Sequence, residues 1–368
     1  MRVNSLSLIS YRNYDQLDLH LKPGINLFFG KNGQGKTNLV EAISFCSTLS
    51  SHRSPNSALV ASDKPTASIG AVIENNQKTL RLGVELNKDT ANRFSLNGNI
   101  VKRSSEILGL LTSVIFSPED IDLIRRDPQT RRAFLNNLGI QLKPAYYKTL
   151  QDYDRVLKQR NALLKSARGK PNVDLSTLGL WDENLIDLSV KIISAREDLI
   201  SRLSPLIQKN YDEISSSTNQ ISIKQQNNFE IDYSQPLEDL KTSLQKTITS
   251  QRQNELDRGV TLVGPHRDEL LITLNGLTAK EHASQGEAWS LALSLKIASA
   301  ELISEVSDTG QPVMILDDVF SVLDTTRRNA LTSFITGYEQ VLITAAVEQD
   351  VPIESAMTRF SISGGKVE

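Results

Sequence analysis

The sequence has little cysteine, little histidine and no long apolar stretch, and each shortage removes a class of protein. Cys46 is the only cysteine among 368 residues, which excludes an internal disulfide and a CxxC metal or redox site. The histidines His20, His52, His266 and His282 lack zinc-ligand spacing. There is no apolar run of about 18 residues and no signal-peptide pattern, so we expect a cytoplasmic protein without a membrane partner.

The charges of the chain nearly cancel. Lys and Arg number 41 and Asp and Glu number 43, which leaves a net charge of -2. This balance excludes a protein that binds polyanions by bulk charge, so any contact with nucleic acid must come from local basic patches. The length of 368 residues predicts two or three globular domains.

The sequence of the N-terminal third predicts several strands and one glycine-rich loop. Leucines at period two (Leu17, Leu19, Leu21) indicate a strand, and residues 25–29 form a short apolar run typical of a buried strand. A helix is expected from residue 38 to about residue 47. Antiparallel strands are expected at residues 67–73, 79–86 and 94–96, with a turn at residues 97–98.

The middle of the chain has helical periodicity. Apolar residues between positions 144 and 216 recur at steps of three and four, which predicts two long amphipathic helices folded back as a hairpin. Pro205 is expected to end or kink the second helix. The hairpin either packs on the core or projects as an arm, and the sequence does not separate these alternatives. Residues 217–250 are polar and resist assignment.

The C-terminal third predicts an almost entirely apolar helix at about residues 285–306, followed by buried strands at 312–316 and 341–344. The expected fold class is α/β, with a mixed sheet in a head region plus a helical lobe that contains an antiparallel helical hairpin. We expect residues 1–115 and 251–368 to form the two parts of the head, and residues 116–250 to form the lobe with its hairpin.

A phosphate-binding loop is the strongest motif. Residues 30–37 fit GxxxxGK[ST] at every fixed position, between an expected strand and an expected helix. Glycines leave room for backbone N–H groups to converge on phosphate oxygens, and the helix directs its positive end at the anion. Lys36 can reach the β- and γ-phosphates, and Thr37 can ligate Mg²⁺. The expected ATP-binding residues here are Gly30, Lys31, Asn32, Gly33, Gln34, Gly35, Lys36 and Thr37.

Two carboxylates follow the buried strand at 312–316. Asp317 is expected to hold Mg²⁺ together with Thr37, and Asp318 to polarise the attacking water, with Lys36 as its catalytic partner. An Asp base is one methylene shorter than Glu, so slow turnover is expected. Thr344, at the end of the next buried strand, is a candidate sensor of the γ-phosphate.

A second anion site is expected at Ser284, Gln285 and Gly286. Ser284 and Glu287 have capping-box spacing, so a plain helix cap is the alternative interpretation. In ABC-type ATPases, however, such a signature turn covers the γ-phosphate held by the P-loop of another subunit. Residues 321–324 match the D-loop of that class. Together these elements predict an ABC-type P-loop ATPase head. They also predict two nucleotides between two chains in a head-to-tail homodimer.

Segments along the whole chain resemble the RecF family of bacterial recombination-repair ATPases, which is related to the SMC heads. The matching segments are residues 11–14, 30–41, 51–53, 116–120, 131–135, 264–270, 284–287 and 316–324. The resemblance implies binding of ATP and DNA with ATP-dependent dimerisation, and we expect a weak, DNA-stimulated ATPase. No basic stretch is interleaved with aromatic residues, so duplex DNA or a single/double-strand junction is expected rather than single-stranded DNA. It also implies action with RecR and RecO in loading RecA at gaps, and a role in the SOS response. Ala288 and Trp289 depart from the usual family pattern, as do residues 344–347.

Several residues have open assignments. Basic groups at residues 102–103, 125–126, 131–132 and 158–170 are candidates for phosphate contacts or simply solvated faces, and Arg131→Ala is expected to lower the salt slope of DNA binding by about one unit. His266 and Arg267 either line the nucleotide or dimer face, or His266 is a packed structural histidine. Residues 11–13 are candidates to contact adenine or phosphate.

Two other functions compete with DNA repair. A transporter ATPase subunit is also soluble, but it is usually shorter and lacks a helical hairpin. A scaffold with an inactive nucleotide site conflicts with intact Lys36, Thr37 and Asp317. ATP-dependent dimers that bind DNA would separate the repair function from both alternatives.

Overall fold

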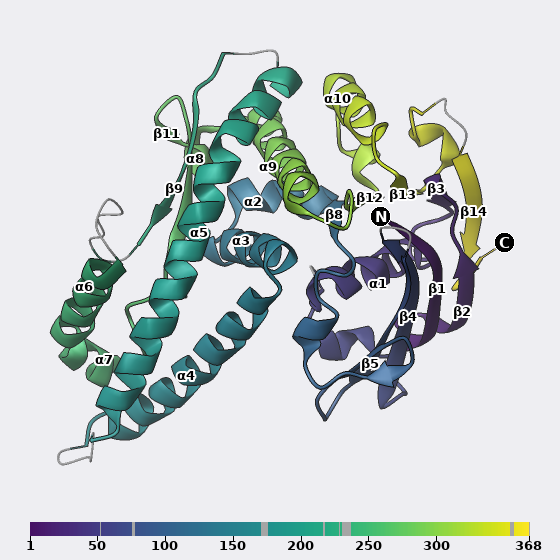
Figure 1. The fold of residues 1–368 in the computed structure, drawn as a ribbon. Coiled ribbons are helices and arrows are strands. Elements are labelled where there is room, and N and C mark those ends of the chain that lie inside the picture. Colours follow the sequence, from purple (N-terminus) through teal and green to yellow (C-terminus); the bar gives the residue numbers. More distant parts are fainter. Residues whose placement is uncertain are drawn as a thin grey trace.

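The computed structural model describes residues 1–51, 53–75, 78–170, 176–215, 218–227, 229, 237–353 and 357–367. Two regions stand side by side, one rich in strands and one mainly helical (Figure 1). His52 lies outside the described residues. Within these ranges, no helix has the length and apolar character needed to cross a bilayer.

The strands come in three sheets. Their bounds are β1 (Arg2–Tyr11), β2 (Tyr14–His20), β3 (Gly24–Phe29), β4 (Thr66–Asn75), β5 (Lys78–Asn87), β6 (Arg93–Leu96), β7 (Asn99–Ile100), β8 (Ser113–Phe116), β9 (Ile221–Gln226), β10 (Glu269–Leu274), β11 (Leu277–Thr278), β12 (Val313–Asp317), β13 (Gln340–Ala345), β14 (Met357–Ser363) and β15 (Lys366–Val367). The sheet orders are β2-β1-β4-β5-β6-β7, β15-β14-β3-β13-β12-β8 and β11-β10-β9.

The α-helices are α1 (Lys36–Thr48), α2 (Asp122–Arg125), α3 (Pro128–Leu142), α4 (Ala145–Ala167), α5 (Leu178–Ser215), α6 (Leu237–Ser250), α7 (Arg252–Arg258), α8 (Ala279–His282), α9 (Gln285–Val306) and α10 (Thr325–Ile335). Short 3₁₀ turns lie between them, at Asn56–Leu59, Ser104–Glu106, Pro118–Ile121, Val319–Ser321 and Glu348–Asp350.

The parallel part of the second sheet separates two apolar cores. Along β12, Val313 and Ile315 enter one core while Met314 and Leu316 enter the other. Side chains alternate between the faces of a strand, so a strand covered on both faces is apolar throughout. This explains why the expected buried strands at residues 312–316 and 341–344 have no polar alternation, and both strands are confirmed.

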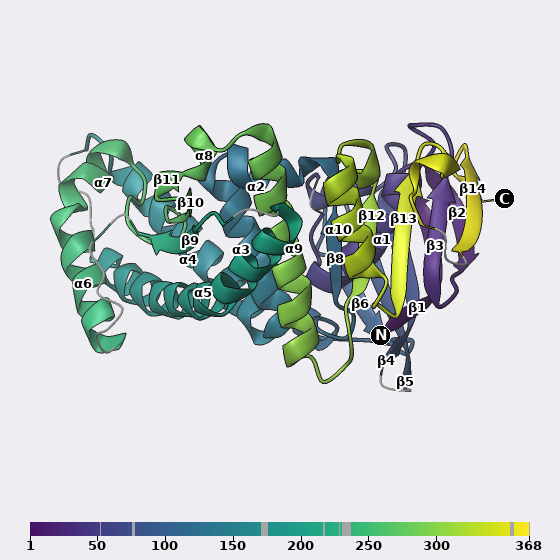
Figure 2. The ribbon, with the colours of Figure 1, turned by 90° about the horizontal axis from the view of Figure 1, so that it is seen from above.

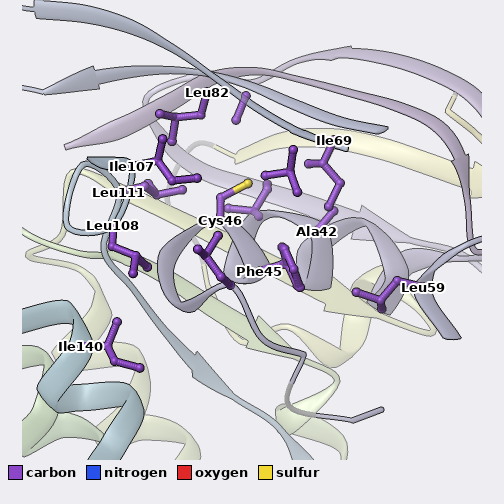
Figure 3. Close-up of a cluster of buried hydrophobic side chains, with 14 of the residues drawn as sticks. Ala42, Phe45, Cys46, Leu59, Ile69, Leu82, Ile107, Leu108, Leu111 and Ile140 are labelled. Atoms are coloured by element: carbon purple, nitrogen blue, oxygen red, sulfur yellow. The ribbon is translucent and has the colours of Figure 1, made fainter. Parts of the chain in front are cut away.

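Helix α1 fills the space between the parallel sheet and the antiparallel sheet. Ala42 and Cys46 of α1 point toward Ile69 and Leu82 of the antiparallel sheet (Figure 3), and Phe45 belongs to the same core. Burial raises the pKa of the Cys46 thiol to about 12, so this cysteine is packed as an apolar side chain rather than as a reactive thiolate. The expected antiparallel strands at 67–73, 79–86 and 94–96 are confirmed as parts of β4, β5 and β6.

The helical hairpin of α4 and α5 is confirmed, and it packs on the core rather than projecting alone. Leu199, Leu203 and Ile207 of α5 share a core with α9, while α6 and α7 lie beside the far end of the hairpin (Figure 2). Pro205 does not end α5, which continues to Ser215. Buried side chains on both sides of Pro205 hold the helix together despite the lost backbone hydrogen bond.

The apolar helix expected at 285–306 is confirmed as α9, which is buried around most of its surface. Several strands were not expected from the sequence, among them β8, β10 and β14. The domain boundary expected between residues 250 and 251 separates two strands that pair with each other. Ile223 of β9 lies before this boundary and is paired with Ile272 of β10, which lies after it. We therefore propose that the helical lobe extends through α9.

Candidate nucleotide site

The P-loop runs from the end of β3 into the start of α1. Gly35 caps α1 with φ +113°, and no side chain accepts a hydrogen bond from the first turn. The Lys36 side chain folds back toward the start of the loop. Its Nζ donates hydrogen bonds to the carbonyl oxygens of Gly30 at 2.5 Å and Lys31 at 3.0 Å. The helix terminus and the ammonium therefore present positive charge around the same loop.

Gly30 occupies a place that no other residue fits. Its φ is +148°, and an added Cβ would lie 2.3 Å from the carbonyl oxygen of Ile362 on β14. Since β14 pairs with β3 in parallel, a strand from near the end of the chain lies directly against the start of the P-loop. The glycine pattern in the sequence therefore reflects both backbone conformation and close packing.

Two distant turns brace the P-loop at Gln34. The backbone N–H of Gly364 donates to Gln34 Oε1 at 2.7 Å, and that of Gly365 donates to the Gln34 carbonyl at 3.2 Å. Asn13 Nδ2 donates to the same carbonyl at 3.1 Å. This C-terminal turn was not predicted from the sequence, although the glycine pair Gly364-Gly365 is a signal of a turn.

Asp317 joins the ends of three elements. Its Oδ1 accepts hydrogen bonds from Thr37 Oγ1 at 2.9 Å and from Thr344 Oγ1 at 2.6 Å. The parallel register pairs Asp317 with Thr344 directly, so the two side chains meet at the carboxyl edge of the sheet. Burial raises the pKa of Asp317, while the two hydroxyl donors oppose that rise.

Asp318 leaves the strand in a left-handed conformation, with φ +53°. Its backbone N–H donates to Thr344 Oγ1 at 3.0 Å. Burial raises the pKa of Asp318, and the charge of Lys36 lowers it. Burial also lowers the pKa of Lys36, against the opposing charges of Asp318 and Asp317. The ammonium and the two carboxylates are thus close enough to influence one another's ionisation.

The signature turn lies on the other lobe. The expected capping box is confirmed: the Ser284 N–H donates to Glu287 Oε2 at 2.8 Å, and the Glu287 N–H donates to Ser284 Oγ at 3.3 Å. Ser284 and Gln285 are exposed. Among the described residues, no hydrogen bond or ion pair joins residues 284–286 to residues 30–37. A single chain therefore does not bring its two expected anion sites together.

Two arginines expected on a DNA surface are buried in ion pairs instead. Arg131 pairs with Glu269 through two hydrogen bonds of 2.7 Å and also donates to the carbonyls of Leu123 and Arg126. Arg160 donates to Asp182 at 2.8 Å and pairs with buried Glu255. The expectation that these two side chains contact phosphates is wrong, because distant carboxylates already hold them in the interior.

His266 follows the structural alternative. Its Nδ1 lies 2.6 Å from the Tyr153 hydroxyl, and burial lowers its pKa to about 4. Tyr11 is fully buried, so its side chain does not offer the nucleotide contact for which it was a candidate. Arg12 pairs with buried Glu41 at 2.8 Å. Of residues 11–13, only Asn13 reaches the P-loop.

The chain has clear relatives. The family model "RecF/RecN/SMC N terminal domain" matches residues 2–363. The DNA replication and repair protein RecF of Clavibacter sepedonicus is 45% identical and covers 100% of this chain and 95% of the relative. The DNA replication and repair protein RecF of Leifsonia xyli subsp. xyli is 43% identical, and the match covers 100% of this chain and 99% of that relative.

Solved structures agree. A structure of the recombination mediator protein RecF-ATPrS in the RecFOR pathway matches with a TM-score of 0.90 at 30% identity, covering 100% of this chain and 97% of the other. An Smc head domain from Pyrococcus furiosus matches with a TM-score of 0.53 at 15% identity over 100% and 95% of the two chains, which shows the shared head fold alone. The expected ABC-type head with its mixed sheet is therefore confirmed, and the chain belongs to the RecF family.

Proposed function

We propose that this chain binds ATP at its P-loop and acts in DNA replication and repair. One observation carries the ATP proposal: Thr37, Asp317 and Thr344 meet in a hydrogen-bonded set at the edge of the sheet, beside the cradle of Lys36. Two RecF structures described as RecF-ATPrS and RecF-ATP have this fold, which supports the same ligand here. The relatives named for DNA replication and repair support the process.

The residues at the edge of the sheet suit Mg²⁺ as well. Thr37 and Asp317 offer one hydroxyl and one carboxylate, both hard oxygen ligands. Among the described residues, no three His, Cys, Asp or Glu side chains gather as a metal-binding group. A site with so few protein ligands fits Mg²⁺, which commonly binds through one or two carboxylates together with substrate phosphates and water. When bound, the ion would neutralise charge on those phosphates.

The proposed chemistry is slow hydrolysis of ATP. Lys36 would leave its backbone partners and pair with the β- and γ-phosphates, while the P-loop N–H groups and the start of α1 bind phosphate oxygens. Asp318 would accept a hydrogen bond from the attacking water. Its backbone is fixed through the bond to Thr344, which couples the candidate sensor to the candidate base. The short Asp318 side chain suits a switch with low turnover, stimulated by DNA.

The proposed active form is a homodimer with ATP between the chains. Ser284, Gln285 and Gly286 are separated from the P-loop of their own chain, and Ser284 and Gln285 are open to a partner. Val322 lies in the proposed D-loop at residues 321–324. It is apolar, and yet 41% of its surface is exposed. Both features fit a surface that a second head covers. Each P-loop would then meet the signature turn of the partner.

DNA is the proposed macromolecular partner, as duplex or single/double-strand junction, with RecR and RecO as protein partners. The proposed role is loading of RecA at gaps and support of the SOS response. Arg131 and Arg160 are excluded as candidates because they are buried in ion pairs. The candidate basic groups that are exposed include Lys102, Arg103, Arg126, Lys158, Lys165, Arg168 and Lys170. These can make sequence-independent phosphate contacts.

One set of measurements tests the proposal. Titration of a fluorescent ATP analogue, sedimentation with and without ATP, and a DNA gel shift are made on the wild-type chain and on Lys36→Ala and Ser284→Arg. We expect Lys36→Ala to lose nucleotide binding, and Ser284→Arg to bind nucleotide as a monomer. Unchanged nucleotide binding by Lys36→Ala would refute the P-loop assignment, and ATP-dependent dimers of Ser284→Arg would refute the dimer.

A further inference from the structure

Arg327 connects two surfaces that the proposed function uses separately. It lies in the first turn of α10, directly after residues 321–324. Its backbone N–H donates to Asp324 Oδ1 at 3.0 Å, which makes Asp324 the N-cap of α10, and its guanidinium also pairs with that carboxylate. One end of the contact is therefore fixed to the proposed D-loop.

The other end of the contact reaches α9. Arg327 Nε donates to Ser290 Oγ at 3.0 Å, and Ser290 is fully buried. The same guanidinium lies against Gly286 of the signature turn, since a Cβ added to Gly286 would lie 2.9 Å from Arg327 Nη2. The Arg327 side chain is only 17% exposed. It therefore fills the space between the signature turn and the D-loop rather than extending into solvent.

We propose that Arg327 is a positioning residue that holds the signature turn and the D-loop at a fixed distance from each other. The inference rests on the proposed ATP-dependent dimer for its consequence. In that dimer both surfaces of one chain must meet the partner at the same time, so their relative position decides how well the interface closes. A planar guanidinium with several donors in a fixed geometry suits this task better than a flexible ammonium.

Gly286 takes part in the same packing. A side chain at this position would have to displace the guanidinium, so the small residue lets Arg327 approach the turn. The Ser284-Gln285-Gly286 pattern therefore has a second physical reason besides the proposed anion binding. The position of Arg327 was not evident from sequence, because Ser290 lies 37 positions away from it.

The first test uses the free monomer and needs no dimer. Hydrogen–deuterium exchange is measured without nucleotide on the wild-type chain, on Arg327→Gln and on Arg328→Gln. Arg328 is a matched control, because its side chain donates to the Leu323 carbonyl at 2.8 Å. We expect Arg327→Gln to speed amide exchange about tenfold at residues 286–290 and 321–327. The reason is that the substitution removes the charged hydrogen bonds that hold these two segments together. Arg328→Gln should leave residues 286–290 unchanged. Unchanged exchange in Arg327→Gln would overturn the proposal.

The second test measures the consequence for assembly. Sedimentation with ATP should show dimerisation of Arg327→Gln weakened about tenfold, while the affinity of the monomer for a fluorescent ATP analogue stays at the wild-type value. Ser290→Ala should weaken dimerisation less, and the double variant should be no weaker than Arg327→Gln alone, because both changes remove one contact. Additive effects would overturn the proposal. Absence of ATP-dependent dimers in the wild-type chain would instead refute the proposed function, and the exchange experiment would still decide the inference.

Discussion

Thr37 and Asp317 lie 280 positions apart in the sequence, and the Thr37 hydroxyl donates a hydrogen bond of 2.9 Å to the Asp317 carboxylate. The bond joins the first turn of α1 to the end of β12. Thr344 Oγ1 donates to the same carboxylate oxygen at 2.6 Å. The parallel register of β12 and β13 and the position of α1 therefore bring the three side chains of the candidate site together.

Replacement of Asp317 by Asn should remove the effect of Mg²⁺ on ATP affinity. The amide can still accept hydrogen bonds from Thr37 and Thr344, but it lacks the negative charge that a divalent cation needs. We expect the ratio of ATP dissociation constants without and with Mg²⁺ to fall at least about tenfold, in titrations of a fluorescent analogue. Thr344→Val is the control, since it keeps the carboxylate. A full Mg²⁺ effect in Asp317→Asn would show that the ion binds elsewhere.

Gly30→Ala should disrupt the nucleotide site and destabilise the fold. A Cβ at this position meets the Ile362 carbonyl oxygen at 2.3 Å and is strained at φ +148°, so β14 must move away from β3. We expect a loss of about 2–4 kcal/mol in urea unfolding, together with weaker ATP binding. Gly337→Ala is the matched control, because nothing lies within 4 Å of its added Cβ. Equal stability of the two variants would contradict the packing of β14 on the P-loop.

Arg131→Ala should act on stability rather than on DNA binding. Removal of the guanidinium leaves Glu269 without its bidentate partner and leaves two backbone carbonyls unpaired. We expect a loss of about 3–5 kcal/mol in urea unfolding. The control is Arg126→Ala, whose side chain is 70% exposed and should cost less than about 1 kcal/mol. A stable Arg131→Ala variant with a reduced salt slope of DNA binding would restore the original surface assignment.

The contribution of Asp268 to the free energy of unfolding should fall as the pH rises toward neutrality. Burial raises its pKa from 3.8 to about 7, although Arg196 and the amides of Asn227 and Gln225 oppose the rise. Between these two values the folded chain binds more protons at Asp268 than the unfolded chain does. The contribution of this group to the free energy of unfolding therefore falls with pH, by at most about 1.4 kcal/mol per pH unit.

Urea unfolding from pH 4.5 to 8 measures this effect. Asp268→Asn removes the titrating group and should gain stability relative to the wild-type chain as the pH increases, up to about pH 7. His266 titrates in both chains and so cancels in the difference. A difference between the two chains that stays constant with pH would mean that Asp268 is ionised throughout.

Local patterns were sufficient to predict several parts of the fold. The P-loop, the capping box of α9, and the bounds of α9 follow from residues that are neighbours in sequence, because turns and caps are local structures. The family was also evident from such segments, and the comparisons confirm it. The strand β8 was not predicted because its short apolar run has no periodicity of its own. The strands β10 and β14 were not predicted either.

The sequence by itself determined that a phosphate loop stands between a strand and a helix, and that an acidic pair ends a buried strand. Only the tertiary structure decided that Asp317 and Thr37 touch, that Arg131 and Arg160 are interior ion pairs, and that the chain's last turn braces Gln34. The physical reason is the range of the interactions. Glycine conformation and helix capping depend on adjacent residues, whereas the partner of a charge is chosen by packing between segments far apart along the chain.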